Sequence, residues 1–554
     1  MSQKSGEDVL DPPSAEPVQP AIVPAGRRTS AVADNAAGVD RTAHERTLPM
    51  SGAARFVLGT ASATCALIVL DTNVVAVSLP SIARSFHASF ADVEWVVSAY
   101  MVAFAACLLP AGALADRLGR RTMLLAGLGV FMLASLGCGL APSATLLNVA
   151  RAIKGVGASM LLTSALAVIA NTFHEGPART RAWAVWGTCM GVATTIAPLI
   201  GGVITQWLGW RWIFLLNLPV CAVLAWCVRR SIRESRNPLA GPVDIAGSAL
   251  FGSALALGVW ALIGAQPAGW TSALTAARFA GCAALLIAFV LVERTRRHAM
   301  IDLALFRQPK FVAAVLAMFG YAACAQVMMT FLPLYLQNAF GLSAVVAGLG
   351  MLPFAIAMIV GPYIGAALSA RISGTALLSV GLLLIAAGNL LTAFVARDAH
   401  YGLVALAMIV TGCGAGVLNG DTQKAIMACV PVNRTGMASG ISTTTRFTAI
   451  VTSVGVLGAV LAASTRTALQ SDTTLAPAIR GQLDSSFMSR VLAGDVAHAT
   501  AHLPFDTAAQ LAAAARASFA SGFASAVCVA GFFAGLVAAG VWLLGRNRAM
   551  AARS

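Results

Sequence analysis

Long apolar stretches recur along almost the whole chain, with short polar segments between them. Each stretch is close to the roughly 20 residues that a helix needs to cross a bilayer. About fourteen are found, near residues 57–80, 94–115, 122–141, 143–169, 182–206, 212–230, 244–265, 274–292, 312–337, 345–369, 374–397, 402–428, 437–463 and 518–544. Lipid offers no partner to open backbone groups, so each stretch is expected to be a helix. The pattern predicts an all-α integral membrane protein with about fourteen transmembrane helices.

Three polar segments interrupt or flank these helices. Residues 1–53 are rich in Pro, Ala and charge and show no apolar periodicity, which predicts a disordered cytoplasmic tail. Residues 464–515 form one long external loop, which is either a simple connector or an amphipathic lid. Residues 546–554 form a short second tail in the cytoplasm.

Composition excludes a soluble protein. Of the 554 residues, 58% are hydrophobic and 11% are charged, which leaves too few polar side chains to cover a water-exposed surface. The net charge of +15 does not indicate a nucleic-acid partner, because the basic residues lie in short clusters between apolar stretches. The eleven cysteines show no CxxC spacing and are expected to pack, not to form disulfides or bind metal.

Lysine and arginine cluster in alternate polar segments, and such clusters mark the cytoplasmic side of a membrane protein. The clusters are Arg117, Arg120 and Arg121; Arg179 and Arg181; Arg229, Arg230, Arg233 and Arg236; Arg294, Arg296, Arg297, Arg307 and Lys310; and Arg546, Arg548 and Arg553. They predict an even number of spans with both termini in the cytoplasm. The heavy use of Ala, Gly and Arg is typical of a GC-rich bacterial genome, so the expected location is the bacterial inner membrane.

Two acids lie well inside the apolar stretches. Of the 22 Asp and Glu residues, these are Asp71 and Asp421. A carboxylate in hydrocarbon is costly, so such residues usually face a bundle interior and handle ions or protons. All seven histidines lie in tails, in loops or at span ends. Carboxylates, with Asp71 first among them, are therefore the expected proton carriers.

A basic residue lies at a depth similar to that of Asp71. At about 1.5 Å of rise per residue, Asp71 and Arg151 are roughly 13 and 12 Å from the outer ends of their spans. They can form an ion pair that switches, in which Asp71 keeps its proton while Arg151 is distant and releases it as Arg151 approaches. The alternative is a purely structural pair. Lys154, one turn further along, can line the cavity and repel cationic cargo or can pair with Asp71.

The second half of the chain carries a further polar group. Asn419, Asp421 and Lys424 share one span, and Arg446 lies in the next. The i,i+3 spacing of Asp421 and Lys424 fits a local helical pair. The alternative is a second charge site in which Arg446 faces Asp421 across the bundle.

The segment after the second span reads GALADRLGRR, residues 112–121. Its glycines allow close helix contact, and its acid and arginines on either side of a glycine turn can form a charge-paired latch between neighbouring helices. Positive-inside clustering alone would explain the arginines but not the spacing of the other residues. The latch residues are Gly112, Asp116, Arg117, Gly119, Arg120 and Arg121. With the number of spans, this segment resembles the loop 2–3 motif of the major facilitator superfamily.

Two further stretches resemble the fourteen-span drug:proton antiporter family within that superfamily. LDTNVVAVSLP, residues 70–80, resembles its first-span motif, with Asn73 and Ala76 where Thr and Asn are usual. LNVARAIKGVGAS, residues 147–159, resembles its fourth-span motif, with Lys154 where Gln is usual.

A third stretch, GVATTIAPLIGG at residues 191–202, is similar to the fifth-span antiporter motif of this family. Its site residues are Gly191, Pro198, Gly201 and Gly202, whereas Ala193 and Ala197 replace two glycines. The small-xxx-small spacing of Gly187 and Gly191, and of Gly361 and Gly365, predicts close helix contacts.

The resemblance covers about residues 55–545 and implies two six-helix bundles that rock around a central cavity. The bundles would comprise residues 54–230 and 311–545. Residues 231–310 would supply two extra central helices with their flanking cytoplasmic loops.

The resemblance also implies the activity, which is proton-coupled efflux of drugs or other small amphipathic organic compounds. The proton gradient would be the driving force, with no cofactor, and the protein would be a monomer in the bilayer; a periplasmic adaptor is compatible with the family. Two alternatives stay open: a proton-coupled symporter of a metabolite, and a self-resistance exporter of one natural product. No P-loop, HExxH or nucleophile-elbow motif is evident in the sequence, so neither an enzyme nor ATP-driven transport is expected.

Overall fold

The computed structural model describes residues 51–173, 176–236, 244–296, 303–398, 400–430, 435–473, 475, 485–496, 500 and 503–551. Most of the predicted N-terminal tail therefore lies outside the described residues. The contacts considered below lie within one compact unit that begins at Gly52.

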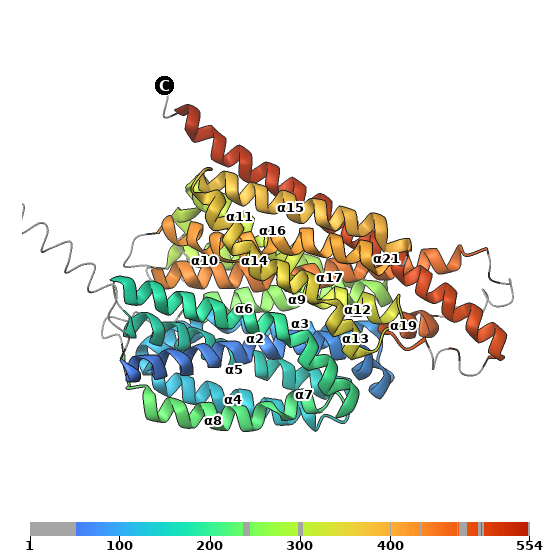
Figure 1. Ribbon diagram of the computed structural model, residues 1–554, viewed down its shortest axis with the longest axis horizontal. Coiled ribbons are helices and arrows are strands. Elements are labelled where there is room, and N and C mark those ends of the chain that lie inside the picture. The colour runs from blue at the N-terminus through green and yellow to red at the C-terminus, as the bar shows by residue number, and fades with distance from the viewer. Residues whose placement is uncertain are drawn as a thin grey trace, which may run out of the picture. The chain divides into compact units, whose positions relative to one another are not determined.

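Every regular element in these described ranges is a helix, and the long helices run side by side (Figure 1). In chain order they are α2 (Gly52–Phe86), α3 (Phe90–Leu118), α4 (Arg120–Gly139), α5 (Ala144–Thr172), α6 (Gly176–Trp207), α7 (Trp212–Leu215), α8 (Asn217–Ser231), α9 (Ile245–Ala268), α10 (Ala273–Thr295), η1 (Leu303–Arg307), α11 (Pro309–Tyr321), η2 (Ala322–Gln326), α12 (Met328–Asn338), α13 (Ala344–Gly350), α14 (Leu352–Ser369), α15 (Gly374–Val395), η3 (Ala396–Asp398), α16 (Tyr401–Ala428), α17 (Thr435–Gln470), α19 (Ser485–Ala493) and α21 (Phe505–Ala551). Fourteen helical stretches in the described part are long and apolar enough to cross a membrane, which confirms the predicted fold class.

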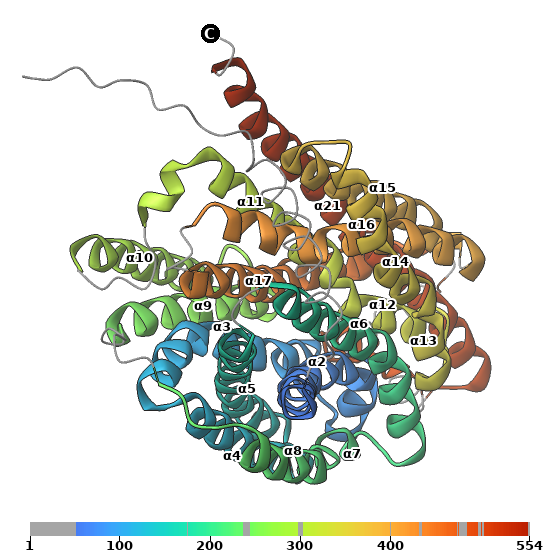
Figure 2. The ribbon, with the colours of Figure 1, turned by 60° about the vertical axis from the view of Figure 1, so that its left-hand side comes forward.

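The helices from α2 to α8, here called the first half, pack around α2. This helix contacts α5, α6 and α8, and α3 and α4 both pack on α5 (Figure 2). In the second half, from α11 to α21, α15 packs against α16 and α21, and α14 packs against α16. The charged site described below is built on the α2–α5 contact.

The two predicted extra helices are α9 and α10. Helix α9 packs on α3 of the first half and on α17 of the second, whereas α10 packs mainly on α9 (Figure 2). The pair therefore lies along one edge where the two halves meet and does not separate them.

The span that begins with α11 is interrupted by the π-helical turn η2. Such a turn leaves carbonyls without their usual helical partners, and neighbouring side chains supply replacements. Asn389 Nδ2 donates to the carbonyl of Cys324 at 2.8 Å, and Ser453 Oγ donates to that of Ala323 at 2.6 Å. The sequence gave no signal for this break, which depends on side chains from α15 and α17.

The long external loop is shorter than predicted, because α17 continues to Gln470 and α21 already begins at Phe505. Between them α19 packs into an apolar cluster with both helices. It also reaches the first half, since Ser489 Oγ accepts a hydrogen bond from Phe90 N at 3.1 Å. In Figure 1 α19 lies at the end of the helices where α12 and α13 are found. These contacts pack the described part of the loop against both halves.

At that same end, backbone contacts join the two halves. A Cβ at Gly202 of α6 would lie 2.5 Å from the carbonyl oxygen of Ala344, and one at Gly348 would lie 2.5 Å from that of Pro198. A Cβ at Gly201 would lie 2.9 Å from the carbonyl oxygen of Val74 in α2. The glycines thus let α6 contact α2 and α13 through its backbone. We call the α6–α13 contact the outer seam, because it lies on the side that the sequence predicts to face away from the cytoplasm.

The prediction of close contact at Gly187 and Gly191 is wrong for this conformation, because a Cβ at either position would meet nothing within 4 Å. The equivalent prediction for Gly361 is confirmed, since a Cβ there would lie 2.5 Å from the Cα of Gly416. Gly365 packs on Val417 and beside Asp421. The inner part of α6 therefore borders open space, unlike its outer part.

We predict that Gly202→Ala opens the outer seam, because the added methyl group meets a backbone carbonyl that cannot move alone. Amide hydrogen exchange in the outer part of α6 and in α13 should become several-fold faster. Gly191→Ala is the matched control on the same helix and should leave exchange unchanged. Equal exchange in Gly202→Ala and wild type would show that the seam does not depend on this contact.

Candidate functional site

Asp71 lies near the middle of α2. Helix α2 continues to Phe86, so Asp71 is about 22 Å from this end of the helix at 1.5 Å per residue. The residue is 4% exposed. A carboxylate at this position needs partners from neighbouring helices.

Helix α5 supplies these partners because its glycines let it approach two other helices. Gly155 lies against the backbone carbonyl of Tyr100 in α3, and a Cβ at Gly157 would lie 2.8 Å from Phe131 N in α4. The close packing on both sides fixes the intervening turns of α5. Arg151 and Lys154, one turn apart, are thereby held on the face toward α2.

Both cations contact the carboxylate. Arg151 Nη1 donates to Asp71 Oδ2 at 3.0 Å, and Lys154 Nζ donates to Oδ1. Asn217 Nδ2, from the start of α8, donates to Oδ1 at 3.0 Å. Arg151 Nε also donates to the carbonyl of Val96 at 2.8 Å. Every oxygen of Asp71 thus has a donor, and the predicted pairing of Asp71 with Arg151 is present.

Aromatic rings surround the cations. The guanidinium of Arg151 lies 4.2 Å from the ring centroid of Tyr100. Lys154 Nζ lies 4.6 Å from the Phe131 ring and 4.9 Å from the Phe214 ring. Ring faces attract cations and replace part of their lost hydration.

This first-half charge site, made of Asp71, Arg151, Lys154 and Asn217, is closed to solvent. Both cations are 0% exposed. The two alternatives for Lys154 are thereby decided for this conformation: it pairs with Asp71 and does not line an open cavity. Two cations share one carboxylate, so removing the acid would leave both without an anion.

The second-half polar residues form a different arrangement. The Tyr321 hydroxyl donates to Asn419 Oδ1 at 3.0 Å, and Arg446 Nη2 donates to the Asn419 carbonyl at 3.1 Å. Lys424 Nζ pairs with Asp421 Oδ1 at 3.0 Å, within α16. The local helical pair is therefore present, whereas Arg446 contacts Asn419 and no ion pair joins it to Asp421 in the described residues.

The latch is present as an ion pair between α3 and α4. Arg120 Nη2 lies 3.0 Å from Asp116 Oδ1. Gly112 makes ordinary contact with Thr163 of α5, and Arg117 is exposed. Gly119 joins the two helices with φ at 116°, a conformation that favours glycine.

Glu234, in the segment after α8, completes this latch and was missed from the sequence. Its carboxylate accepts hydrogen bonds from Arg121 N at 3.1 Å, Thr122 N at 3.0 Å and Thr122 Oγ1 at 2.6 Å, at the start of α4. It lies directly over Gly119, where a side chain would collide with it. Partial desolvation opposes ionisation of Glu234, but these hydrogen bonds and one from Ser235 N outweigh it and lower its pKa.

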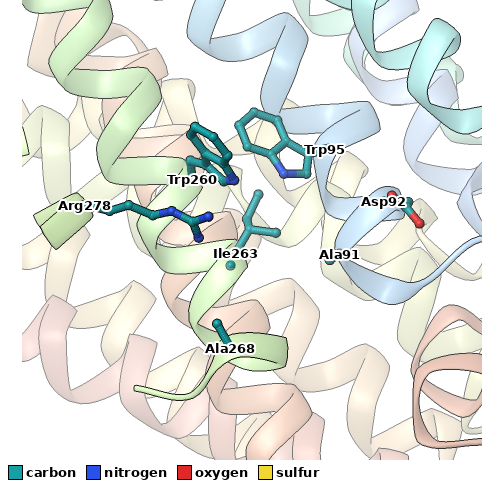
Figure 3. Close-up of a pocket in the computed structure, with 8 residues that line it drawn as sticks. Ala91, Asp92, Trp95, Trp260, Ile263, Ala268 and Arg278 are labelled. Carbon is teal, nitrogen blue, oxygen red and sulfur yellow. The ribbon is translucent and has the colours of Figure 1, made fainter. Parts of the chain in front are cut away.

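A cavity of about 400 Å³ lies apart from both charge sites, between the start of α3 and the outer ends of α9 and α10 (Figure 3). Arg278 lies over the Trp260 ring, 4.4 Å from its centroid. The other lining residues are Ala91, Asp92, Trp95, Ile263, Gly264 and Ala268. None of them belongs to the predicted site.

The sequence also missed Asn217 and Glu94. Asn217 lies among apolar residues after GWRWIFLL, and an isolated amide there gave no reason to connect it with Asp71. Glu94 was placed at the edge of a span, but it is 4% exposed and packs against Gly458 of α17. The contact of Asn217 with Asp71 and that of Glu94 with Gly458 both depend on which helices become neighbours.

We predict that Asp71→Asn destabilises the protein more than Lys154→Met does. The first variant leaves two buried cations without an anion, which costs on the order of 3–5 kcal/mol. The second leaves Asp71 and Arg151 as a one-to-one pair. Melting temperatures of the purified protein in detergent measure the order, and the double variant should lie between the two. A loss in Lys154→Met as large as that in Asp71→Asn would contradict this assignment.

We also predict that Glu234 stabilises the latch in a pH-dependent way. Since its pKa is lower in the folded protein, its contribution is present above the ordinary glutamate pKa of 4.5 and is lost as pH falls through the folded value. Glu234→Ala should therefore lower the melting temperature by a few degrees at pH 7, and the difference from wild type should shrink below pH 4.5. A pH-independent difference would show that the charge is not involved.

Comparisons with known proteins agree with this geometry. The model of the Major Facilitator Superfamily matches residues 61–455. The multidrug efflux pump LfrA of Mycolicibacterium smegmatis is 32% identical over 84% of this chain and 91% of its own. The multidrug resistance protein Stp of Mycobacterium tuberculosis is 34% identical over 72% of this chain and 74% of its own. The tetracenomycin C resistance and export protein of Streptomyces glaucescens is 30% identical over 87% of this chain and 89% of its own.

Among solved structures, a bacterial homologue of the human lysosomal transporter Spinster shares the fold. Its TM-score is 0.62 at 16% identity, over 90% of this chain and 98% of that one. With the family match and the relatives above, the helices, the latch and the buried charge site have one explanation: the chain is a multi-pass membrane protein that belongs to the Major Facilitator Superfamily, among relatives named for multidrug resistance and efflux.

Proposed function

We propose that the protein exports small amphipathic organic compounds across a bacterial inner membrane in exchange for protons. The relatives named for multidrug resistance, efflux and export support the export of drugs. Membership of a transporter superfamily, and the lack of an enzyme motif in the sequence, argue against a catalytic function. The observation that carries proton coupling is the buried carboxylate Asp71 with its two cations.

The coupling step would act on the contact between α2 and α5. A proton that binds the Asp71 carboxylate neutralises the anion that Arg151 and Lys154 share. The two cations then repel each other and are no longer attracted to α2, so the helices must rearrange. Release of the proton restores the contact. Protonation and helix position are thereby linked in one site.

The outer seam and the latch would be the parts that move. The seam closes the outer end through the backbone contacts of Gly202 and Gly348, while Gly187 and Gly191 border open space on the inner part of α6. In this arrangement cargo would enter from the cytoplasm. Opening of the seam, with closure near the latch, would then expose the cargo to the outside.

The clusters of arginine in the predicted inner loops support cytoplasmic termini for the whole chain. The exporter would act as a monomer, with the lipid bilayer and protons as its constant partners. The packing of α3 and α4 on α5, and of α15 on α16 and α21, supports the division into residues 54–230 and 311–545 as moving bodies. The contacts of α9 with α3 and α17 agree with a place for 231–310 at their edge.

The experiment is dye retention in an efflux-deficient bacterial host, with ethidium, Nile red and rhodamine B as cationic, neutral and zwitterionic probes. Wild type should lower the retention of at least one dye, and a protonophore should abolish this effect. Asp71→Asn, expressed in equal amount in the membrane, should retain the dye as vector-only cells do.

Arg466→Gln is a matched control, because Arg466 is an exposed cation at the outer end of α17. It should export as wild type does. Proton-dependent accumulation of a dye by wild type would instead support the symporter alternative. Unchanged efflux in Asp71→Asn would contradict the assigned coupling site.

A further inference from the structure

The predicted charge-site residues contain more cations than acids. Asp71 is shared by Arg151 and Lys154, and Asp421 pairs with Lys424. Arg446 is left over: within the described parts of the chain, no carboxylate oxygen lies within 4 Å of its guanidinium. Glu94 packs at Gly458, which is roughly 18 Å further along α17.

The Arg446 side chain is held in place, but most of its hydrogen-bond donors have no acceptor among the described residues. Its Nη2 donates to the carbonyl of Asn419, and its guanidinium lies 5.7 Å from the ring centroid of Tyr321. A guanidinium carries five N–H donors, and one of them has an acceptor among the described residues. The remaining donors are available to a planar anion such as a carboxylate.

The surroundings of Arg446 are partly open. Arg446 and Asn419 are both partly exposed, and a Cβ at the neighbouring Gly420 would meet nothing within 4 Å. The Tyr321 hydroxyl occupies the side-chain oxygen of Asn419, so the Nδ2 amino group of this side chain stays available as a second donor. By contrast, Arg151 and Lys154 are fully buried and already paired.

We propose that Arg446 and the Asn419 amide bind an acidic group of the cargo, so that amphipathic organic acids are the preferred substrates. This inference rests on the proposed export function. An uncompensated cation inside a membrane helix is costly, and an anionic ligand offsets that cost when it binds. Asp421 does not oppose this, because Lys424 neutralises it within the same turn. Outward movement of an anion is also favoured by an inside-negative membrane potential.

The test uses two dyes that differ by one carboxylate, rhodamine B and its ethyl ester. Binding to the purified full-length protein is measured by fluorescence anisotropy at pH 7. Wild type should bind the acid about tenfold more tightly than the ester, the scale of one charge-assisted contact. Arg446→Gln should remove this preference, Arg446→Lys should retain part of it, and Arg466→Gln should keep it in full.

Equal binding of acid and ester by wild type, or binding of neither, would overturn the anion site. A preference that persists in Arg446→Gln would overturn the assignment to Arg446. Efflux of both dyes in cells separates this proposal from the export function. A binding preference without any proton-dependent efflux would contradict export and leave the anion site standing, whereas efflux without preference would do the reverse.

Discussion

One carboxylate holding two cations, out of contact with water, is the interaction on which the first half depends. Asp71 of α2 accepts hydrogen bonds from partners on two other helices, since Arg151 and Lys154 come from α5 and Asn217 from α8. A buried ion pair adds little net stability compared with apolar packing, but its loss is expensive because the remaining charges stay buried. The site therefore acts as a constraint on helix position: any change at the acid forces α2, α5 and α8 to respond together.

This constraint works only because glycine places the helices close enough. Gly155 and Gly157 bring α5 against α3 and α4, which fixes the direction of the two cations. The same device recurs in α6, where Gly202 forms the outer seam while Gly191 borders open space. Backbone contact is well suited to a surface that opens and closes, because it excludes water and no interlocked side chain has to move first.

The sequence was sufficient for the number of helices, their location in a membrane and the pairing of Asp71 with Arg151, because each has a local signal: apolar length, basic clusters and an acid in an apolar run. It was insufficient for Asn217, Glu234 and the π-helical turn at Ala322–Gln326. These features exist because segments that are distant in sequence meet in the fold. The sequence around a single amide or glutamate does not indicate which distant residue it will contact. Gly187 and Gly191 show the converse, since the spacing predicted a contact that this conformation does not make.

The two halves use their charges in opposite ways. In the first half, burial and full pairing suit an ion that must be sealed from both sides of the membrane while the protein changes shape. In the second half, Arg446 stays partly exposed and lacks a carboxylate among the described residues, which suits a ligand that arrives and leaves. Were both sites equally open, proton and cargo could cross independently. In the proposed function, this difference in burial would allow one movement to couple the two, because the sealed site would respond to its proton and the open one to its cargo.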